Sequence, residues 1–109
     1  MKKKFEILFL EDAKAFLSIL DTKTLQKVLQ NIEKAQILHD PKLFKKLSGE
    51  IWEFRTQYSG MQYRFLAFWD KTNKKNTLVI ATHGFVKKQN AVPKKEIEKA
   101  EKLRTQYFE

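Results

Sequence analysis

The chain has 109 residues, of which 42% are hydrophobic and 13% aromatic, and its formal net charge is +9 at pH 7. This length predicts one domain, residues 1–109, with one modest core, and three glycines and two prolines argue against a disordered or linker-rich chain. Cysteine is absent, which excludes a disulfide framework and a thiolate metal site.

The N-terminal segment MKKKFEILFL is basic and then apolar, but Glu6 interrupts the apolar run and Glu11–Asp12 ends it. The run is too short for a signal peptide and far below the roughly 20 apolar residues of a membrane span. We therefore expect a cytoplasmic protein without a membrane partner. The net charge favours a polyanion such as nucleic acid, or an acidic protein, as partner, and the alternative is a solvated basic surface.

The first half of the chain predicts one strand and two helices. Residues 5–10, FEILFL, predict a short strand that is buried on both faces. Apolar residues then recur at helical spacing over residues 13–20 and 25–35, with Asp21 placed to cap the second helix. His39 precedes Asp40-Pro41, which ends that helix, and is interpreted as a capping residue. Residues 42–47, KLFKKL, predict a connecting segment with solvated lysines.

The second half predicts three antiparallel strands, over residues 51–58, 61–69 and 77–82. Ser59–Gly60 forms the tight turn of the first hairpin, and residues 70–75 form a polar loop. His83 to Val86 lead off the end of the third strand. Pro93 opens a last helix with an apolar face of Ile97, Ala100, Leu103 and Tyr107. The order is β-α-α-β-β-β-α, an α+β domain whose helices pack on one side of an antiparallel sheet.

The first hairpin is expected to bring two arginines together on neighbouring strands. A two-residue turn at Ser59–Gly60 places Arg55 directly across from Arg64, where like charges repel by about 0.2–1 kcal/mol. An anion between the two would explain the pair, because the planar fork of arginine matches phosphate. The alternative is that each arginine reaches solvent, or that Arg55 pairs with Glu53 or Glu50.

Further cations follow near the same end of the sheet. The register of the second hairpin stays open and brings either Thr82 or His83 opposite Arg64. Histidine can transfer a proton near neutral pH, whereas the alternative is a strand-end histidine bonded to the backbone. Lys87 and Lys88 point towards the same rim and would stabilise a pentacoordinate phosphate.

These residue types fit RNA cleavage without a metal. Such cleavage needs a base for the 2′-hydroxyl, cations on the phosphate, and an acid for the leaving 5′ oxygen. The arginines and lysines can supply the cations, and His83 or a lysine of lowered pKa one of the other groups. The sequence has no cluster of metal ligands and no glycine-rich phosphate loop, so we expect neither a metal nor another cofactor. Tyr58, Tyr63, Trp69 and Phe85 are candidates for stacking on bases, with core packing as the alternative.

Three segments follow one another along the chain: LFKKLSGEIWEFRTQYSGMQYRFLAFWD, ATHGFVKK and PKKEIEKAEKLRTQYF. They resemble the HigB-like, phage-derived branch of the RelE/ParE toxin superfamily, from about Leu43 to the end. The resemblance implies a type II toxin that cuts mRNA on the ribosome without metal, and a cognate antitoxin of the helix-turn-helix type. The alternatives are a ParE-like toxin that inhibits gyrase without cutting RNA, and a non-catalytic basic binding module.

The resemblance also implies catalytic roles for Arg64, His83 and Lys87. Arg64 matches the phosphate-holding arginine of RelE-type toxins, and Lys87 or Lys88 matches the basic residue after the last strand. His83 lies close to a histidine position of HigB-like relatives. The chain lacks a second nearby histidine, and Tyr107 lies on the apolar face of the last helix. The residues that act as general acid and general base are therefore left unassigned.

Four further residues are implied as RNA contacts. Arg55 matches a basic position on the strand before Arg64, and Lys88 extends the basic rim. Lys45 and Lys46 add charge from the segment that leads into the sheet.

Overall fold

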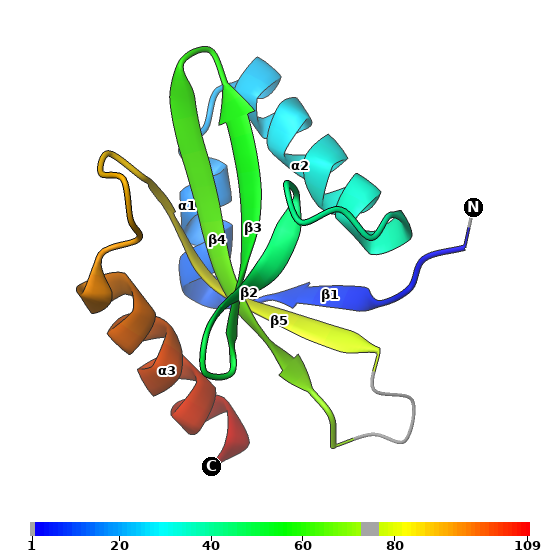
Figure 1. Cartoon of the computed structure of the whole chain (residues 1–109), viewed down its shortest axis with the longest axis vertical. Coiled ribbons are helices and arrows are strands. Elements are labelled where there is room, and N and C mark those ends of the chain that lie inside the picture. The colour runs from blue at the N-terminus through cyan, green and yellow to red at the C-terminus, as the bar shows by residue number, and fades with distance from the viewer. Residues whose placement is uncertain (1, 73–76) are drawn as a thin grey trace.

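The computed structural model describes residues 2–72 and 77–109 and confirms the α+β class. Its elements are a five-stranded sheet and three helices (Figure 1). In chain order they are β1 (Glu6–Phe9), α1 (Glu11–Ser18), α2 (Thr22–Ile37), β2 (Phe44–Ser48), β3 (Ile51–Tyr58), β4 (Met61–Asp70), β5 (Leu78–Val86) and α3 (Lys94–Phe108). The strand order across the sheet is β1-β5-β4-β3-β2.

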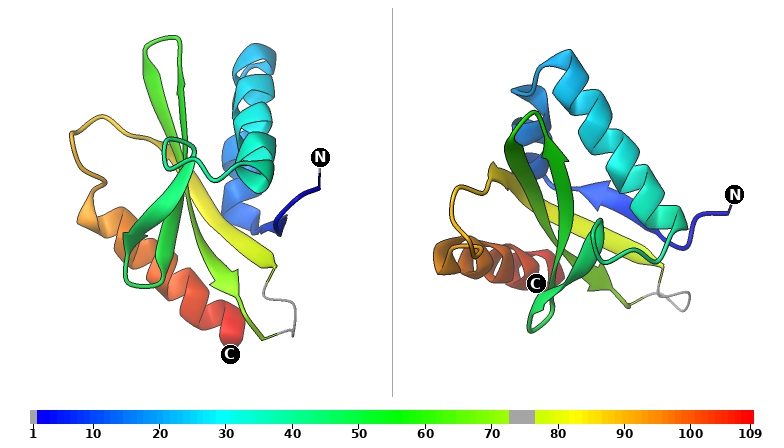
Figure 2. Two further views of the ribbon diagram at one scale, coloured as in Figure 1. Left: turned by 45° about the vertical axis from the view of Figure 1, so that its right-hand side comes forward. Right: turned by 45° about the horizontal axis from the view of Figure 1, so that its top comes forward.

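The helices cover both faces of the sheet, with α1 and α2 on one and α3 on the other (Figure 2). Along β4, Phe65 and Ala67 belong to the core beneath α1 and α2, whereas Leu66 and Phe68 belong to the core beneath α3. The predicted packing of all helices on one side is therefore wrong. A central strand that is apolar on both faces needs a cover on each.

Two expectations about the sheet are also wrong. β1 pairs with β5 in parallel, so the sheet is mixed rather than antiparallel. Residues 44–48, within and just after the expected connecting segment, form the edge strand β2, which pairs with β3. Its lysines face solvent, as is common on edge strands, where charge discourages pairing with other chains.

β5 extends through Val86, so His83 lies inside this strand rather than beyond its end. A bulge shifts the register of β4 and β5: Leu66 pairs with His83 and Ala67 with Ala81, which leaves Thr82 as the extra residue. The sequence pattern of β5 does not mark this bulge.

The predicted turns and caps are confirmed in part. Ser59 and Gly60 have φ angles of 51° and 78°, which the tight hairpin turn requires. The Asp21 carboxylate accepts a hydrogen bond from the Thr24 N–H at 2.8 Å, the expected helix cap. The C-cap of α2 is Leu38 rather than His39. Of the polar loop expected at residues 70–75, residues 73–75 lie outside the described residues.

The helix α3 is held at three points, although Ala100 is its one fully buried residue. Tyr107 packs against the core beneath α3 and donates a hydrogen bond to the Asp70 carboxylate at 2.7 Å. Lys99 lies 3.2 Å from the carboxylate of Asp12 on α1. Glu96 contacts His83. Among the described residues, no helix is both long enough and apolar enough to cross a membrane.

We expect Tyr107→Phe to lower the free energy of unfolding by about 1–2 kcal/mol at pH 7, because Asp70 loses a hydrogen bond. That bond raises the pKa of Tyr107. Its stabilisation is present below the unfolded pKa of tyrosine and is lost as the pH rises through the folded pKa. Urea denaturation at several alkaline pH values should show a smaller loss of stability for the variant than for the wild type. Tyr58→Phe is the control, and equal alkaline slopes for Tyr107→Phe and the wild type would contradict the assignment.

Candidate functional site

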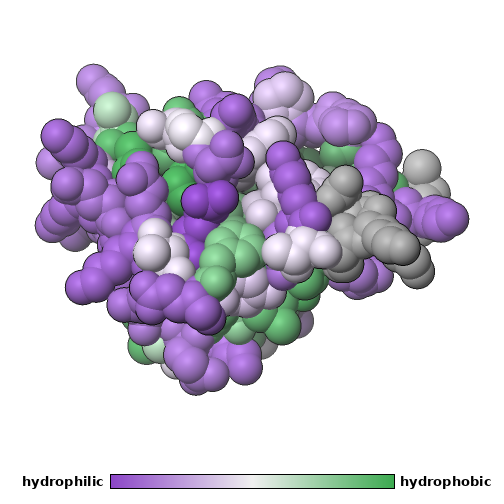
Figure 3. Space-filling model, turned by 90° about the horizontal axis from the view of Figure 1, so that it is seen from below, coloured by the Kyte–Doolittle hydropathy of each residue, from purple (hydrophilic) through white to green (hydrophobic). Residues whose placement is uncertain are grey.

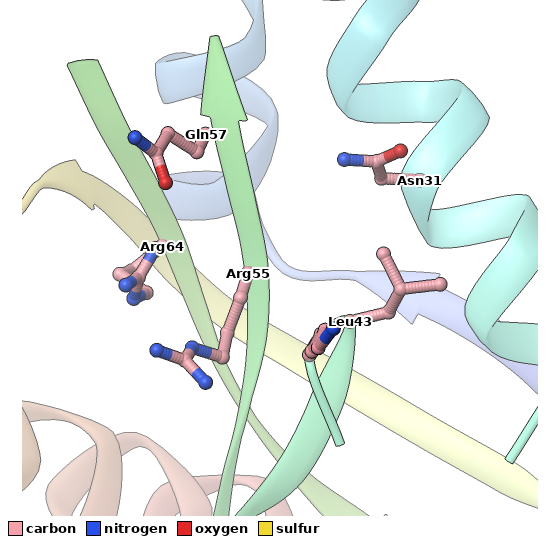
Figure 4. A pocket seen from close by; sticks show the side chains of 6 residues that line it. Asn31, Leu43, Arg55, Gln57 and Arg64 are labelled. Atoms are coloured by element: carbon pink, nitrogen blue, oxygen red, sulfur yellow. The ribbon is translucent and has the colours of Figure 1, made fainter. Parts of the chain in front are cut away.

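The predicted pair of arginines is present. Arg55 on β3 and Arg64 on β4 are directly opposite each other in the hairpin. Figure 4 shows both side chains on the same side of β3 as Gln57, with Asn31 of α2 and Leu43 on the other side. The arginines therefore lie on the face of the sheet that carries α3.

A buried glutamate lies between the two arginines. The Glu53 Oε1 atom is 3.1 Å from the Nε atom of Arg64 and 3.4 Å from the Nε atom of Arg55. Glu53 and Arg64 are each only 3% exposed. The alternative in which Arg55 pairs with Glu53 is thus realised, and Arg64 is buried against a carboxylate instead of standing free at the rim.

Arg64 is further fixed by its own strand. Its Nη1 donates to the Tyr63 carbonyl at 3.1 Å and its Nη2 to the Gln62 side-chain oxygen at 2.9 Å. Burial, and next the charge of Arg55, lower the pKa of Arg64, while Glu53 acts in the opposite direction. The guanidinium group of Arg64 nevertheless remains positively charged at neutral pH. Arg64 therefore holds the neighbouring Glu53 and Gln62 side chains in place, and it has few N–H donors left for a ligand.

Arg55 is the accessible member of the pair. Its side chain is 31% exposed, and no hydrogen bond to its terminal nitrogens is found within residues 2–72 and 77–109. The buried Nε–H groups of both arginines also lack a hydrogen-bond partner there, despite their closeness to Glu53. One carboxylate faces two guanidinium groups, so positive charge and donors remain for an incoming anion.

A cavity of about 300 Å³ opens beside Arg55. It is lined by Asn31, Lys42, Leu43, Arg55, Gln57 and Arg64. The cavity forms where β2 stops short: the Arg55 N–H donates to the Leu43 carbonyl at 2.8 Å, and β2 pairs with β3 only from Phe44 onwards. The outer half of β3 is therefore open at its edge, within reach of a ligand.

Lys87 lies close enough to respond to the arginine charges. Its backbone N–H donates to the carbonyl of Gln62, two residues before Arg64 on β4, at 2.8 Å, and its Nζ donates to the Asn90 carbonyl at 3.0 Å. Burial lowers the pKa of Lys87, and the charges of Arg64 and Arg55 lower it further. Lys88 is exposed beside it, and both line a hollow of about 430 Å³ at the hairpin end.

The two lysines of β2 lie on opposite faces. Lys45 pairs with Glu53, which places it on the arginine face, and its charge also acts on Lys87. Lys46 pairs with Trp52 on the face beneath α2. Of the two expected RNA contacts on β2, Lys45 therefore joins the arginine cluster, defined as Lys45, Glu53, Arg55, Arg64 and Lys87, and Lys46 does not.

His83 is not opposite Arg64, so both expected registers are wrong. Phe85 takes that position, and His83 pairs with Leu66. The His83 ring is on the arginine face but buried beneath α3, with Nδ1 2.9 Å from the Thr82 hydroxyl and Nε2 3.1 Å from Glu96. Burial is the main cause that lowers the pKa of His83, and the hydrogen bond with Glu96 opposes it. Within the described part of the chain, the hydrogen bonds of the His83 ring go to side chains.

Gly84, next to His83, is a point of close approach between α1 and β5. A Cβ atom there would collide with the ring of Phe16 and lie 2.8 Å from the Phe65 ring. The glycine lets α1 pack directly on β5.

The aromatic residues expected to stack on bases are divided between the faces. Tyr63 and Trp69 pack against the core beneath α1 and α2, whereas Phe85 packs against the core beneath α3 and stacks on His83 at 5.7 Å. Tyr58 is partly buried near the hairpin turn. None of the four therefore combines full exposure with a place in the arginine cluster.

Glu53 is the residue that the sequence interpretation did not include in the site. The alternation of β3 in WEFR already places it on the same face as Arg55. Its depth depends on α3 and β2, which no local pattern reveals. Within the described part of the chain, no group of three or more His, Cys, Asp or Glu side chains could hold a metal ion.

Comparison with known protein families gives a match to the model of the Gp49 family, described as phage derived protein Gp49-like (DUF891), over residues 15–105. No curated protein matches the chain.

Proposed function

Because the chain belongs to the Gp49-like family of phage-derived proteins, a family of the RelE-like toxin type, we propose that it is the toxin of a type II toxin–antitoxin system. We assign it to the HigB-like branch and infer that it cleaves mRNA on the ribosome in the cytoplasm. The observation that carries the proposal is the arginine cluster, where four cationic side chains surround a single buried carboxylate.

The cluster supports a division of roles. Arg55, the exposed guanidinium, holds the scissile phosphate together with Lys45, and Arg64 fixes Glu53 and thereby the position of Arg55. Neutralising phosphate charge in a partly dry cavity is the largest contribution that such side chains make to phosphoryl transfer. Lys88 contacts RNA next to Lys87 at the rim.

Lys87 is the group best placed for proton transfer, because its lowered pKa brings it closer to neutral pH. In this reaction the 2′-oxygen loses its proton and attacks the phosphorus atom. The bond from phosphorus to the 5′ oxygen breaks, and that oxygen takes up a proton. The products carry a 2′,3′-cyclic phosphate and a 5′-hydroxyl group.

His83 can take part in catalysis only if α3 moves away from the sheet, because Glu96 and the helix cover its ring. In the observed arrangement its role is to hold α3 on the sheet.

The burial of Arg64 and His83 favours the two alternatives in which the protein cuts no RNA. Two of the three expected catalytic residues are enclosed by the protein itself, 3% and 2% exposed. A toxin of the ParE kind, which binds gyrase and cuts no RNA, or a basic binding module needs only the exposed cations Arg55, Lys45 and Lys88. Fold and family do not separate these functions.

The expected partner is a cognate antitoxin, with a helix-turn-helix domain as the inferred type. The net charge of +9 favours an acidic partner surface. Charges on the two proteins would then speed association and keep the toxin neutralised.

We expect cleavage of mRNA on purified ribosomes to be unchanged by EDTA at a concentration that leaves the ribosomes intact, because side-chain cations replace a metal at the phosphate. The rate should also fall steeply with salt, as phosphate contacts require. Sequencing of the cleaved 5′ ends gives the rate, with a metal-dependent ribonuclease as the control for chelation. Activity that disappears with EDTA would count against the mechanism.

A further inference from the structure

On the other face of the sheet, two tryptophans line a cavity of about 250 Å³ near the end of α2. Its floor is Trp52, Trp69, Phe44 and Phe5, and its rim includes Lys4, His39 and Asp40. The volume of the cavity is slightly smaller than that of pockets for drug-sized ligands, which measure about 300–1,000 Å³. It therefore suits a single planar ring system. We propose that it binds a nucleobase of single-stranded RNA.

The aromatic floor has the geometry that base stacking needs. Phe44 stacks on Trp52 with ring centroids 5.0 Å apart and an interplanar angle of 30°, and Trp69 meets Trp52 edge-on at 6.0 Å. Both tryptophans stay only partly buried, because α2 ends at Ile37 and does not cover this end of the sheet. A base can stack on such partly exposed rings whatever its identity, since every base has a π face.

The surrounding charge favours a nucleotide over an apolar protein side chain. Lys46 is directly opposite Trp52 on β2 and is exposed, and Lys4 lies at the rim. Cations beside a stacking platform suit a base with its phosphate, and Asp40 and His39 offer polar groups to the edge of the base. Figure 3 shows the molecule from below, where hydrophobic groups lie between hydrophilic ones on the surface.

The pocket lies next to the cavity beside Arg55. Residues Asp40 to Phe44 separate the two cavities: Lys42 and Leu43 line the one beside Arg55, and Asp40 and Phe44 line the one beside Trp52. A strand of RNA held at Arg55 can therefore cross the open edge of β3 and place another base on Trp52. This extension rests on the proposed function, because that RNA is the source of the base.

The test uses the intrinsic fluorescence of the protein, since Trp52 and Trp69 are its two tryptophans and both line the pocket. The probes are AMP and UMP, with ribose 5-phosphate at equal ionic strength as the control without a base. We expect the nucleotides to quench the emission saturably and ribose 5-phosphate to leave it unchanged. Equal responses to all three compounds, or none, would overturn the proposal.

Two variants locate the binding. Trp52→Leu should weaken nucleotide binding about tenfold, read from Trp69, because one stacking surface is lost. Lys46→Ala, an exposed change that does not disturb the core, should weaken it about threefold. Unchanged affinity in a folded Lys46→Ala variant would contradict the assigned phosphate contact.

A third arm separates this inference from the proposed function. Arg55→Ala should leave AMP binding unchanged, because Arg55 does not line the pocket. Loss of RNA cleavage with retained AMP binding would leave the pocket in place. Intact cleavage without AMP binding would overturn the proposed nucleobase site. Saturable quenching by N-acetyl-leucine amide in place of AMP would assign the pocket to an apolar protein side chain.

Discussion

Arg55→Ala is expected to abolish growth arrest when the protein is induced in bacteria, while the protein stays folded. Arg55 is the accessible arginine of the cluster, and its terminal nitrogens make no hydrogen bond in the described part of the chain. Loss of one donor to a developing phosphate charge reduces turnover by about 10²–10³. Stability should fall little, since the ion pair with Glu53 is 3.4 Å long and poorly aligned.

The measurement is growth after induction, together with urea denaturation of the purified variant. Lys23→Ala is the matched control, because it removes one exposed positive charge from α2, outside the arginine cluster. Full toxicity of Arg55→Ala would show that the cluster has no part in the activity. The same experiment with Arg64→Ala is less informative, because removal of this buried arginine leaves Glu53 poorly compensated and destabilises the fold.

Glu53→Gln is expected to lower the free energy of unfolding by about 3–5 kcal/mol, the range for a buried ion pair that loses one partner. The neutral side chain leaves Arg55 and Arg64 facing each other without a counter-charge. An added anion should then take the place of the carboxylate. We therefore expect sulfate to raise the melting temperature of Glu53→Gln by several degrees more than that of the wild type.

Thermal unfolding in sodium sulfate and in sodium chloride of equal ionic strength measures this difference. Glu50→Gln, which removes an exposed carboxylate at the start of the same hairpin, is the matched control and should respond like the wild type. A variant that folds only in sulfate would also support the account. Equal stabilisation of all three proteins by sulfate would mean that the two arginines do not form an anion site.

The sequence predicted the elements that short-range signals specify. The Asp21 cap, the Ser59–Gly60 turn and the pairing of Arg55 with Arg64 are local, because a two-residue turn determines the register of its own hairpin. The register of β5 was not predictable in this way. Residues 71–77 between β4 and β5 leave several registers possible, and the bulge at Thr82 shifts the pairing by one further residue, so that Phe85 lies opposite Arg64.

Burial was the other property that local pattern did not reveal. Arg64 and Glu53 look like surface residues in an alternating strand, but β4 lies at the centre of the sheet and α3 covers its face. The position of α3 depends on contacts distant in sequence, such as Tyr107 with Asp70 and Glu96 with His83. The sequence therefore indicated the pair of arginines but not the burial of the carboxylate that lies between them.

Cleavage of mRNA by the purified protein on programmed ribosomes tests the central claim most directly. The account predicts cuts within the mRNA that leave 2′,3′-cyclic phosphate ends and that are absent with Arg55→Ala. Intact mRNA in the presence of a folded protein that still arrests growth and inhibits gyrase would contradict it.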